Sequence, residues 1–91
     1  MVNIKYYENV EIWFKCNYLG GKRHGEYISY YISGEINYKC WYIDGRYHGE
    51  YIDYKKSGEI VIIYYYIYGE FVGELEWLSY NRNLKLELLG L

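Results

Sequence analysis

An internal repeat of 24 residues constrains the fold of this chain more than any other feature of its sequence. The segment YLGGKRHGEYISYYISGEINYKCW, residues 18–41, aligns without a gap with YIDGRYHGEYIDYKKSGEIVIIYY, residues 42–65. Half of the 24 aligned positions are identical. Close similarity at a fixed spacing is typical of proteins that stack copies of one small structural unit. We therefore expect the chain to be built from tandem copies of such a unit.

Two incomplete copies flank the full repeats. The opening stretch IKYYENVEIWFKC matches the second half of a copy, with Val10 at the position that Gly34 occupies. The last copy keeps its first glycines but has Arg82 where Gly34 and Gly58 stand. The resulting interpretation is one domain, residues 1–91, with a partial repeat at 1–17, repeats at 18–41 and 42–65, and a degenerate capping repeat at 66–91.

Within each copy the apolar residues alternate with polar ones. In EINYKCWY the residues Ile36, Tyr38 and Cys40 alternate with Asn37 and Lys39, which is typical of a strand with one buried face. Sixteen tyrosines and no proline also favour strands over helices. A Ser-Gly pair between two such runs indicates a hairpin turn. The predicted fold is all-β: a single-layer, twisted antiparallel meander of about eight strands, built from tandem β-hairpins.

The same alternation, if it runs unbroken through all copies, divides the side chains between two faces. We expect the even-numbered apolar residues to form the core face, from Ile28, Tyr30 and Cys40 to Leu78, Leu84, Leu86 and Leu88 in the tail. The odd-numbered face is unusually aromatic. Its candidate binding surface is Tyr27, Trp41, Tyr51, Tyr65 and Trp77, since Tyr and Trp often anchor protein interfaces. The alternative is that these rings only pack within the fold.

The repeated glycines are predicted to be structural. Gly34, Gly45 and Gly58 follow Ser or Asp in turns that require a positive φ. Gly25, Gly49 and Gly73 are predicted to open strands, where a missing side chain indicates a bulge or room for a neighbouring aromatic ring. The full predicted set of turn and strand-start glycines is Gly21, Gly25, Gly34, Gly45, Gly49, Gly58, Gly69 and Gly73.

These recurring residues resemble MORN repeats (membrane occupation and recognition nexus), in the variant found in bacteria and viruses. The pattern is Tyr18, Gly21, Gly25, Tyr30 and Gly34, then Tyr42, Gly45, Gly49, Tyr54 and Gly58, then Tyr66, Gly69 and Gly73. The resemblance implies an elongated single-layer sheet of stacked hairpins, used as a scaffold in many settings. It covers nearly the whole chain, departing at Val10, at Arg82 and in the leucine-rich tail.

The histidines and the recurring glutamates indicate no catalytic or metal site. His24 and His48 occupy equivalent positions in adjacent copies, which places them two strands, or roughly 10 Å, apart. That separation is too large for one metal ion, so we interpret both as turn residues that bond the backbone. Glu26, Glu50 and Glu74 recur at the same spacing, but no base, nucleophile or metal ligand recurs beside them. We predict a non-enzymatic protein without catalytic residues, metal or cofactor.

Cys16 and Cys40 also lie one repeat apart, too far for a disulfide in the predicted register. They are interpreted as buried free thiols, consistent with a reducing compartment. The net charge is −2, with both signs interspersed, which disfavours nucleic acid as a partner. No apolar stretch is long enough to span a bilayer. The predicted location is the cytoplasm.

The function predicted from these features is an interaction scaffold that binds proteins or self-associates through the aromatic sheet surface. The leucine-rich end LKLELLGL, residues 84–91, suggests a homodimer. Two alternatives stay open: a carbohydrate or cell-wall binding module, because tandem Gly, Trp and Tyr hairpins also resemble choline- and glucan-binding repeats, and an antitoxin-like regulator. Contact with membrane lipid is implied only by the family resemblance.

Overall fold

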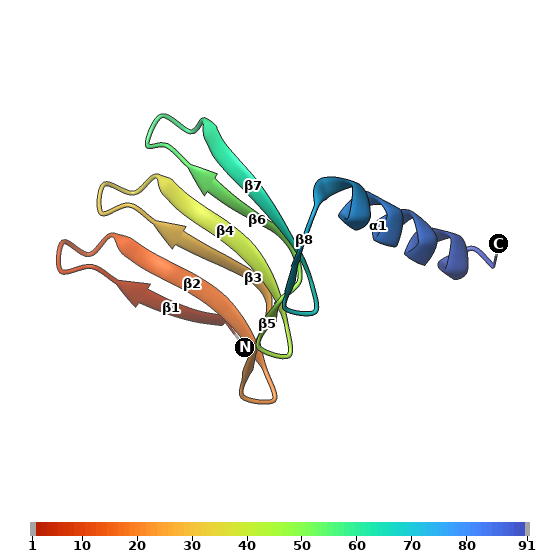
Figure 1. The fold of residues 1–91 in the computed structure, drawn as a ribbon. Helices are drawn as coiled ribbons and strands as arrows, with labels where there is room; N and C mark the ends of the chain where they lie inside the picture. The colour runs from red at the N-terminus through yellow and green to blue at the C-terminus, as the bar shows by residue number, and fades with distance from the viewer. Residues whose placement is uncertain (1, 91) are drawn as a thin grey trace.

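The computed structural model describes residues 2–90, which form one antiparallel sheet followed by one helix (Figure 1). Met1 and Leu91, at the ends of the first and last predicted repeats, lie outside the described residues. The strands follow one another in the sheet in chain order, so the fold is a meander. The elements are β1 Val2–Tyr6, β2 Ile12–Leu19, β3 Lys22–Tyr30, β4 Ile36–Ile43, β5 Arg46–Tyr47, β6 Gly49–Tyr54, β7 Ile60–Ile67, β8 Glu70–Val72 and α1 Glu74–Leu88. The predicted eight-stranded, all-β meander is confirmed, with α1 as an addition.

At one end of the sheet the strands are joined by two-residue turns. Both residues of each turn have a positive φ: Gly20 and Gly21 at 60° and 81°, Asp44 and Gly45 at 48° and 80°, Tyr68 and Gly69 at 44° and 88°. This combination defines the type I′ turn, whose twist matches that of the flanking strands. The glycines predicted at these turns therefore have the conformation that the prediction required.

At the other end the hairpins close through three-residue loops. In the loop of residues 32–34 the amide of Tyr31 donates to the carbonyl of Glu35 at 2.8 Å, and the amide of Gly34 donates to the carbonyl of Tyr31 at 2.9 Å. Gly34 has a φ of 105°, as expected for the left-handed residue of a bulged three-residue hairpin. The loops of residues 8–10 and 56–58 repeat this bonding. Val10 therefore adopts a φ of 65° at a position that favours glycine.

The strand register corrects the predicted division of the faces. Tyr27 lies opposite both Cys16 and Cys40, so an odd-numbered residue of β3 shares a face with even-numbered residues of β2 and β4. The cause lies in both kinds of turn. The two-residue turns, and the three-residue loops together with their bulges, pair residues whose numbers add up to an odd number, as Leu19 and Lys22 or Tyr27 and Cys40 do. Even-numbered apolar residues therefore do not form one face, and the prediction was wrong on this point.

One face, which we call the tyrosine face, carries the most buried cluster. Cys16, Tyr27, Cys40 and Tyr42 form its centre, and Cys40 is only 1% exposed. Partly buried rings surround the cluster: Phe14, Tyr18, Tyr38, Tyr47 and Tyr51. Because residues 2–90 form no second sheet to cover this face, the rings bury the cluster by stacking face to face and edge to face along the sheet.

The opposite face, which we call the tryptophan face, combines apolar and charged residues. It comprises Glu26, Ile28, Trp41, Glu50, Ile52 and Tyr65, as the register shows. Ile28 and Ile52 are buried, whereas Trp41 is 45% exposed. Ile28 and Ile52, expected on the predicted core face with Cys40, therefore lie on the opposite side of the sheet from it.

Helix α1 replaces the strands expected in the last repeat and leads away from the sheet beyond β8 (Figure 1). Its N-cap, Gly73, has extended backbone, and the amide of Trp77 donates to the carbonyl of Gly73 at 3.0 Å. The segment ELEWLSYNRNLKLEL contains no glycine for a hairpin turn, and its Leu, Glu and Lys favour a helix. Acidic residues in the first turn suit the helix dipole. The tail leucines therefore do not join the core face of the sheet, contrary to the prediction.

Tyrosine hydroxyls join each hairpin to the next near the three-residue loops. The hydroxyl of Tyr7 donates to the carbonyl of Tyr30 at 2.8 Å, and that of Tyr31 donates to the carbonyl of Tyr54 at 2.6 Å. Donor and acceptor are 23 residues apart in both cases. These bonds tie consecutive repeats together at the level of side chains as well as through the sheet.

Candidate functional site

The structure does not bring the five predicted surface aromatics together. Tyr27 and Tyr51 belong to the tyrosine face, where Tyr27 is buried in the central cluster. Trp41 and Tyr65 lie on the tryptophan face. Trp77 projects from α1 and its ring packs on that of Tyr65, with centroids 6.3 Å apart and planes inclined by 25°. A surface made of all five residues is therefore not formed.

The rings of Tyr27 and Tyr51 are engaged within the sheet. Phe14, Tyr27, Tyr38 and Tyr51 stack in sequence, with centroid distances of 5.4, 5.8 and 5.3 Å and nearly parallel planes. The guanidinium of Arg23 lies 5.2 Å from the ring centre of Tyr27. Burial is the main cause that raises the pKa of both tyrosine hydroxyls well above the usual value. Both rings contribute to the packing of the fold.

Two of the three remaining candidates, Trp41 and Trp77, line a cavity at the end of the sheet that carries the two-residue turns, and Tyr65 packs behind Trp77. The volume of the cavity is about 350 Å³, and Trp41, Trp77, His24, His48 and Glu50 are among the residues that line it. Trp77 packs edge-on against His48 at 5.8 Å and stacks on Tyr80 at 5.7 Å. Trp77 of α1 therefore supplies one wall, and residues of the sheet supply the rest.

Each histidine of the cavity bonds the turn of the next hairpin. His48 Nδ1 accepts the backbone N–H of Tyr68 at 3.0 Å, and His24 Nδ1 accepts that of Asp44 at 3.4 Å. The predicted bond to the backbone is confirmed for both, but His24 lies within β3 and His48 between β5 and β6, so neither is a turn residue. Burial lowers the pKa of His48, so its ring is neutral at neutral pH. Among residues 2–90 no group of three or more His, Cys, Asp or Glu side chains could hold a metal ion.

The recurring glutamates flank the aromatic residues of this face. Glu26 lies opposite Trp41 on the neighbouring strand, and Glu50 lies opposite Tyr65. Burial, followed by the negative charges of Glu74 and Glu50, raises the pKa of the Tyr65 hydroxyl. The cavity region thus combines indole rings with carboxylates. The 24-residue spacing of the glutamates is in the sequence, but their position beside the tryptophans depends on the register.

Of the strand-start glycines, Gly49 makes room for an aromatic ring and Gly25 lies where the β2–β3 register shifts, as predicted for a bulge, whereas Gly73 differs. A Cβ atom on Gly49 would lie 3.7 Å from Cβ and Cδ1 of Trp41, so the indole rests against this glycine. The equivalent neighbour of Gly25 is the amide of Asn17, at 3.4 Å. Gly73 has no neighbour within 4 Å and serves as the N-cap of α1.

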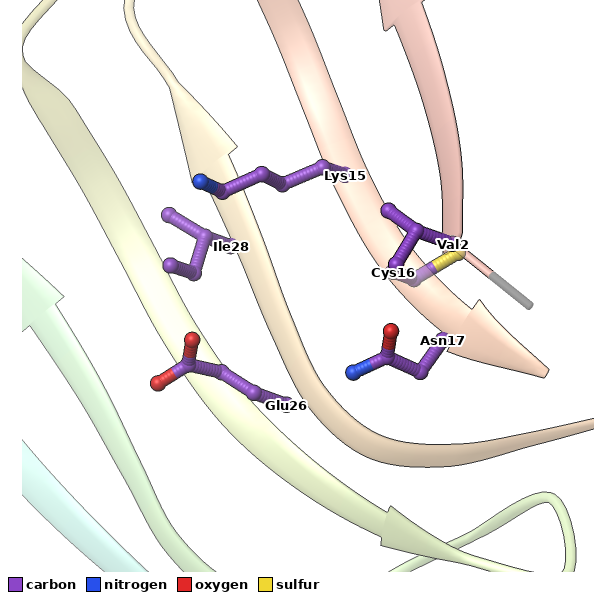
Figure 2. Close-up of a pocket in the computed structure, with 6 residues that line it drawn as sticks. All are labelled: Val2, Lys15, Cys16, Asn17, Glu26 and Ile28. Atoms are coloured by element: carbon purple, nitrogen blue, oxygen red, sulfur yellow. The ribbon is translucent and has the colours of Figure 1, made fainter.

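A second, smaller cavity of about 190 Å³ lies near the N-terminal edge of the sheet (Figure 2). Lys15 of β2 reaches across toward β3, where Ile28 lies between it and Glu26 in this view. Lys15 and Ile28 are opposite each other in the register. The cavity therefore carries one charge of each sign around an apolar floor, and its lining shows no preference for a ligand of either charge.

The thiols are placed as the sequence predicted. Cys16 and Cys40 are buried and free, and both lie opposite Tyr27, on strands to either side of it. Burial raises the pKa of Cys40 to about 12. Because the thiolate is the reactive form, this thiol is unreactive at neutral pH.

Comparison of the chain with protein-family models, with curated proteins and with solved structures finds no match. Among the described residues, no helix has the length and apolar character needed to cross a membrane.

The sequence interpretation missed the contribution of α1 to the cavity. A strand in the last repeat would place Trp77 in a row with Tyr65 on the sheet, whereas on the helix the Trp77 ring lies on top of Tyr65. The signal that could have revealed the helix is the change of composition after Gly73, from Tyr and Ile to Leu, Glu, Asn and Lys.

Proposed function

We propose that this protein is a non-enzymatic interaction scaffold that binds other proteins and associates with copies of itself. Its architecture, a single layer of stacked hairpins, supports this role because both faces of the sheet are available for contact. The recurring Tyr and Gly residues support a MORN-like scaffold as the structural type. The buried free thiols support a reducing, cytoplasmic compartment.

The observation that carries the proposal is the exposure of α1. None of its side chains is buried, although leucine is its commonest residue. Leu75 and Leu88 are 81% and 79% exposed. An isolated helix of this length is only marginally stable in water, and helices gain most of their stability from packing an apolar side. A partner that covers the leucines supplies that packing.

The proposed partner for α1 is the same helix of a second copy. Leu84 and Leu88 continue the side of the helix that carries Trp77, beyond the region where Trp77 packs on the sheet. Lys85 and Glu87 lie between these leucines in the last turn of the helix. Two antiparallel copies that meet at Leu84 and Leu88 would place Lys85 of one helix near Glu87 of the other, and this charge complementarity favours antiparallel pairing.

Size-exclusion chromatography with light scattering tests the self-association. We expect a dimer over a dilution series for the natural chain and a monomer for Leu84→Glu combined with Leu88→Glu, because two charges at the interface centre oppose association. The matched control is Ile32→Glu combined with Ile60→Glu, which introduces the same charges at exposed positions on the far end of the sheet.

The control variant is expected to remain dimeric. A monomeric natural chain at every concentration, or equal loss of association in both double variants, contradicts self-association through α1. Circular dichroism of each variant ensures that a loss of association is not a loss of the sheet.

A further inference from the structure

We propose that the cavity between Trp41 and Trp77 binds an arginine side chain in a basic segment of a partner protein. This inference rests on the proposed scaffold function and names the chemistry of one partner. It depends on three features of the cavity: its unoccupied indole surface, its charge, and the absence of a nearby internal cation.

The indole of Trp41 is available to a ligand. One part of the ring rests on Gly49, yet Trp41 is 45% exposed. Among residues 2–90 no other aromatic ring packs against it. Trp77 faces the same cavity and is held in place by its stacking on Tyr65 and Tyr80. Two indoles on separate elements thus border a space within the size range of small-molecule and side-chain pockets.

The charge of the cavity selects a cation. Glu50 lines it, Glu26 lies opposite Trp41, and Glu74 stands at the start of the helix that carries Trp77. His48 is neutral at neutral pH because burial lowers its pKa. A cation over an indole face is favoured by the ring quadrupole, and more so beside a carboxylate.

No lysine or arginine among residues 2–90 lines the cavity. Within the described chain, the cations that lie over aromatic rings are Arg23 over Tyr27 and Tyr42, Lys39 over Tyr54, and Lys56 over Tyr31. Arg46, the nearest basic residue along the chain to His48, lies with its side-chain stem against Gly69 and does not line the cavity. The cavity therefore offers a cation site that no internal cation fills.

Arginine fits this site better than lysine does. Its guanidinium is planar and weakly hydrated, stacks on aromatic faces, and can donate two parallel hydrogen bonds to one carboxylate. The exposed indole of Trp41 supplies the face and Glu50 the carboxylate. A segment with successive arginines could also reach Glu26, because equivalent positions on adjacent repeats are about 10 Å apart in such a sheet.

The test is a titration with the peptide acetyl-Gly-Arg-Arg-Arg-Gly-amide, followed through the indole N–H signals in NMR spectra. We expect the signals of Trp41 and Trp77 to shift. The signal of Trp13, which stacks on Tyr7 far from the cavity, serves as the internal reference and should stay. The same peptide with citrulline in place of arginine has nearly the same shape without the charge, and we expect it to cause no shift.

Two isosteric variants localise the site. Glu50→Gln should weaken binding of the arginine peptide by about tenfold, which is the size expected for losing one charged hydrogen bond. Glu59→Gln removes the same charge at an exposed position near a three-residue loop, and it should leave the affinity within about twofold, as expected for a distant exposed charge.

Three results would overturn the inference: equal shifts with arginine and citrulline peptides, equal weakening by Glu50→Gln and Glu59→Gln, or shifts of Trp41 and Trp77 with cellotriose but not with the arginine peptide. The last would indicate a carbohydrate site. None of these measurements depends on Leu84 or Leu88. The result of the peptide titration is therefore independent of the light-scattering test of self-association.

Discussion

Single residues set the conformation of the three-residue loops. Each loop places one residue at a positive φ, and two of the three loops use glycine there, at Gly34 and Gly58. The first loop uses Val10, whose β-branched side chain is strained in this conformation. Val10 is 81% exposed, so its side chain gains little from burial in return. The strained backbone of Val10 thus lowers the stability of the first loop, and the other two loops avoid this strain by using glycine.

Replacing Val10 with glycine should stabilise the protein. We expect the free energy of unfolding to rise by about 1 kcal/mol, because relief of the left-handed strain exceeds the entropy that glycine loses on folding. Chemical denaturation measures the change. Gly34→Val, the reverse exchange in the next loop, should lower the free energy of unfolding, since its Cβ would also lie 3.3 Å from Oε2 of Glu11. A stability that is unchanged or lower in Val10→Gly contradicts the account.

The protonation of His48 should make stability depend on pH. Burial lowers the pKa of His48 below the ordinary value of 6.5. Below pH 6.5 the unfolded chain therefore binds a proton at His48 more readily than the folded chain does. The contribution of His48 to the free energy of unfolding is complete above pH 6.5 and decreases as the pH falls below that value. Denaturation at about pH 5.5 and about pH 7.5 tests this. His48→Gln should show a smaller difference between the two conditions, and an equal difference would contradict the assignment.

At the scale of elements, the stacking of hairpins depends on bonds between side chains and the main chain of the next repeat.

The sequence predicted the strands and their turns well, because the alternation and the Asp-Gly and Ser-Gly pairs are local signals. It failed at the faces, since one residue added or omitted in a turn reverses which side chains share a side. It also failed at Glu74–Leu88. Similarity to the repeats predicts strands there, whereas the local composition favours the helix that forms. The candidate site was predicted only in part for both reasons: the sequence indicates Trp41 and Trp77 as surface residues, but not that they meet His48 at one cavity.

Loss of one inter-repeat hydrogen bond should be measurable. Tyr31→Phe removes the hydroxyl that donates to the carbonyl of Tyr54 and keeps the ring. We expect the free energy of unfolding to fall by about 1 kcal/mol, the usual net value of one such bond. Tyr30→Phe is the matched control, because the carbonyl of Tyr30, and not its hydroxyl, bonds Tyr7. Equal losses in the two variants would show that the bond to Tyr54 is not the cause.

At the scale of the whole molecule, the core is a row of side chains along a ribbon. The extents of the molecule are 51, 32 and 22 Å, and buried residues are concentrated in β3, β4 and β6. All residues of β1 are exposed. In such an array each unit is stabilised mainly by its neighbours, so the end units are the weakest.

Hydrogen exchange should therefore show a gradient along the chain. We expect the slowest exchange of backbone amides in β3, β4 and β6 and the fastest in β1 and in the second half of α1, which extends past the sheet (Figure 1). If α1 pairs with a second copy as proposed, its second half should exchange more slowly in the natural chain than in the variant with Leu84→Glu and Leu88→Glu. Uniform protection over all strands would contradict the repeat-by-repeat description.

The type I′ turns and bulged loops return the chain to the same orientation after every 24 residues. An extra copy spliced in at Tyr42 would lengthen the ribbon by two strands while each original hairpin kept an equivalent neighbour on both sides. Gene duplication alone could thus increase the length of the sheet and the number of aromatic and glutamate positions along its tryptophan face, and no new kind of core would be needed.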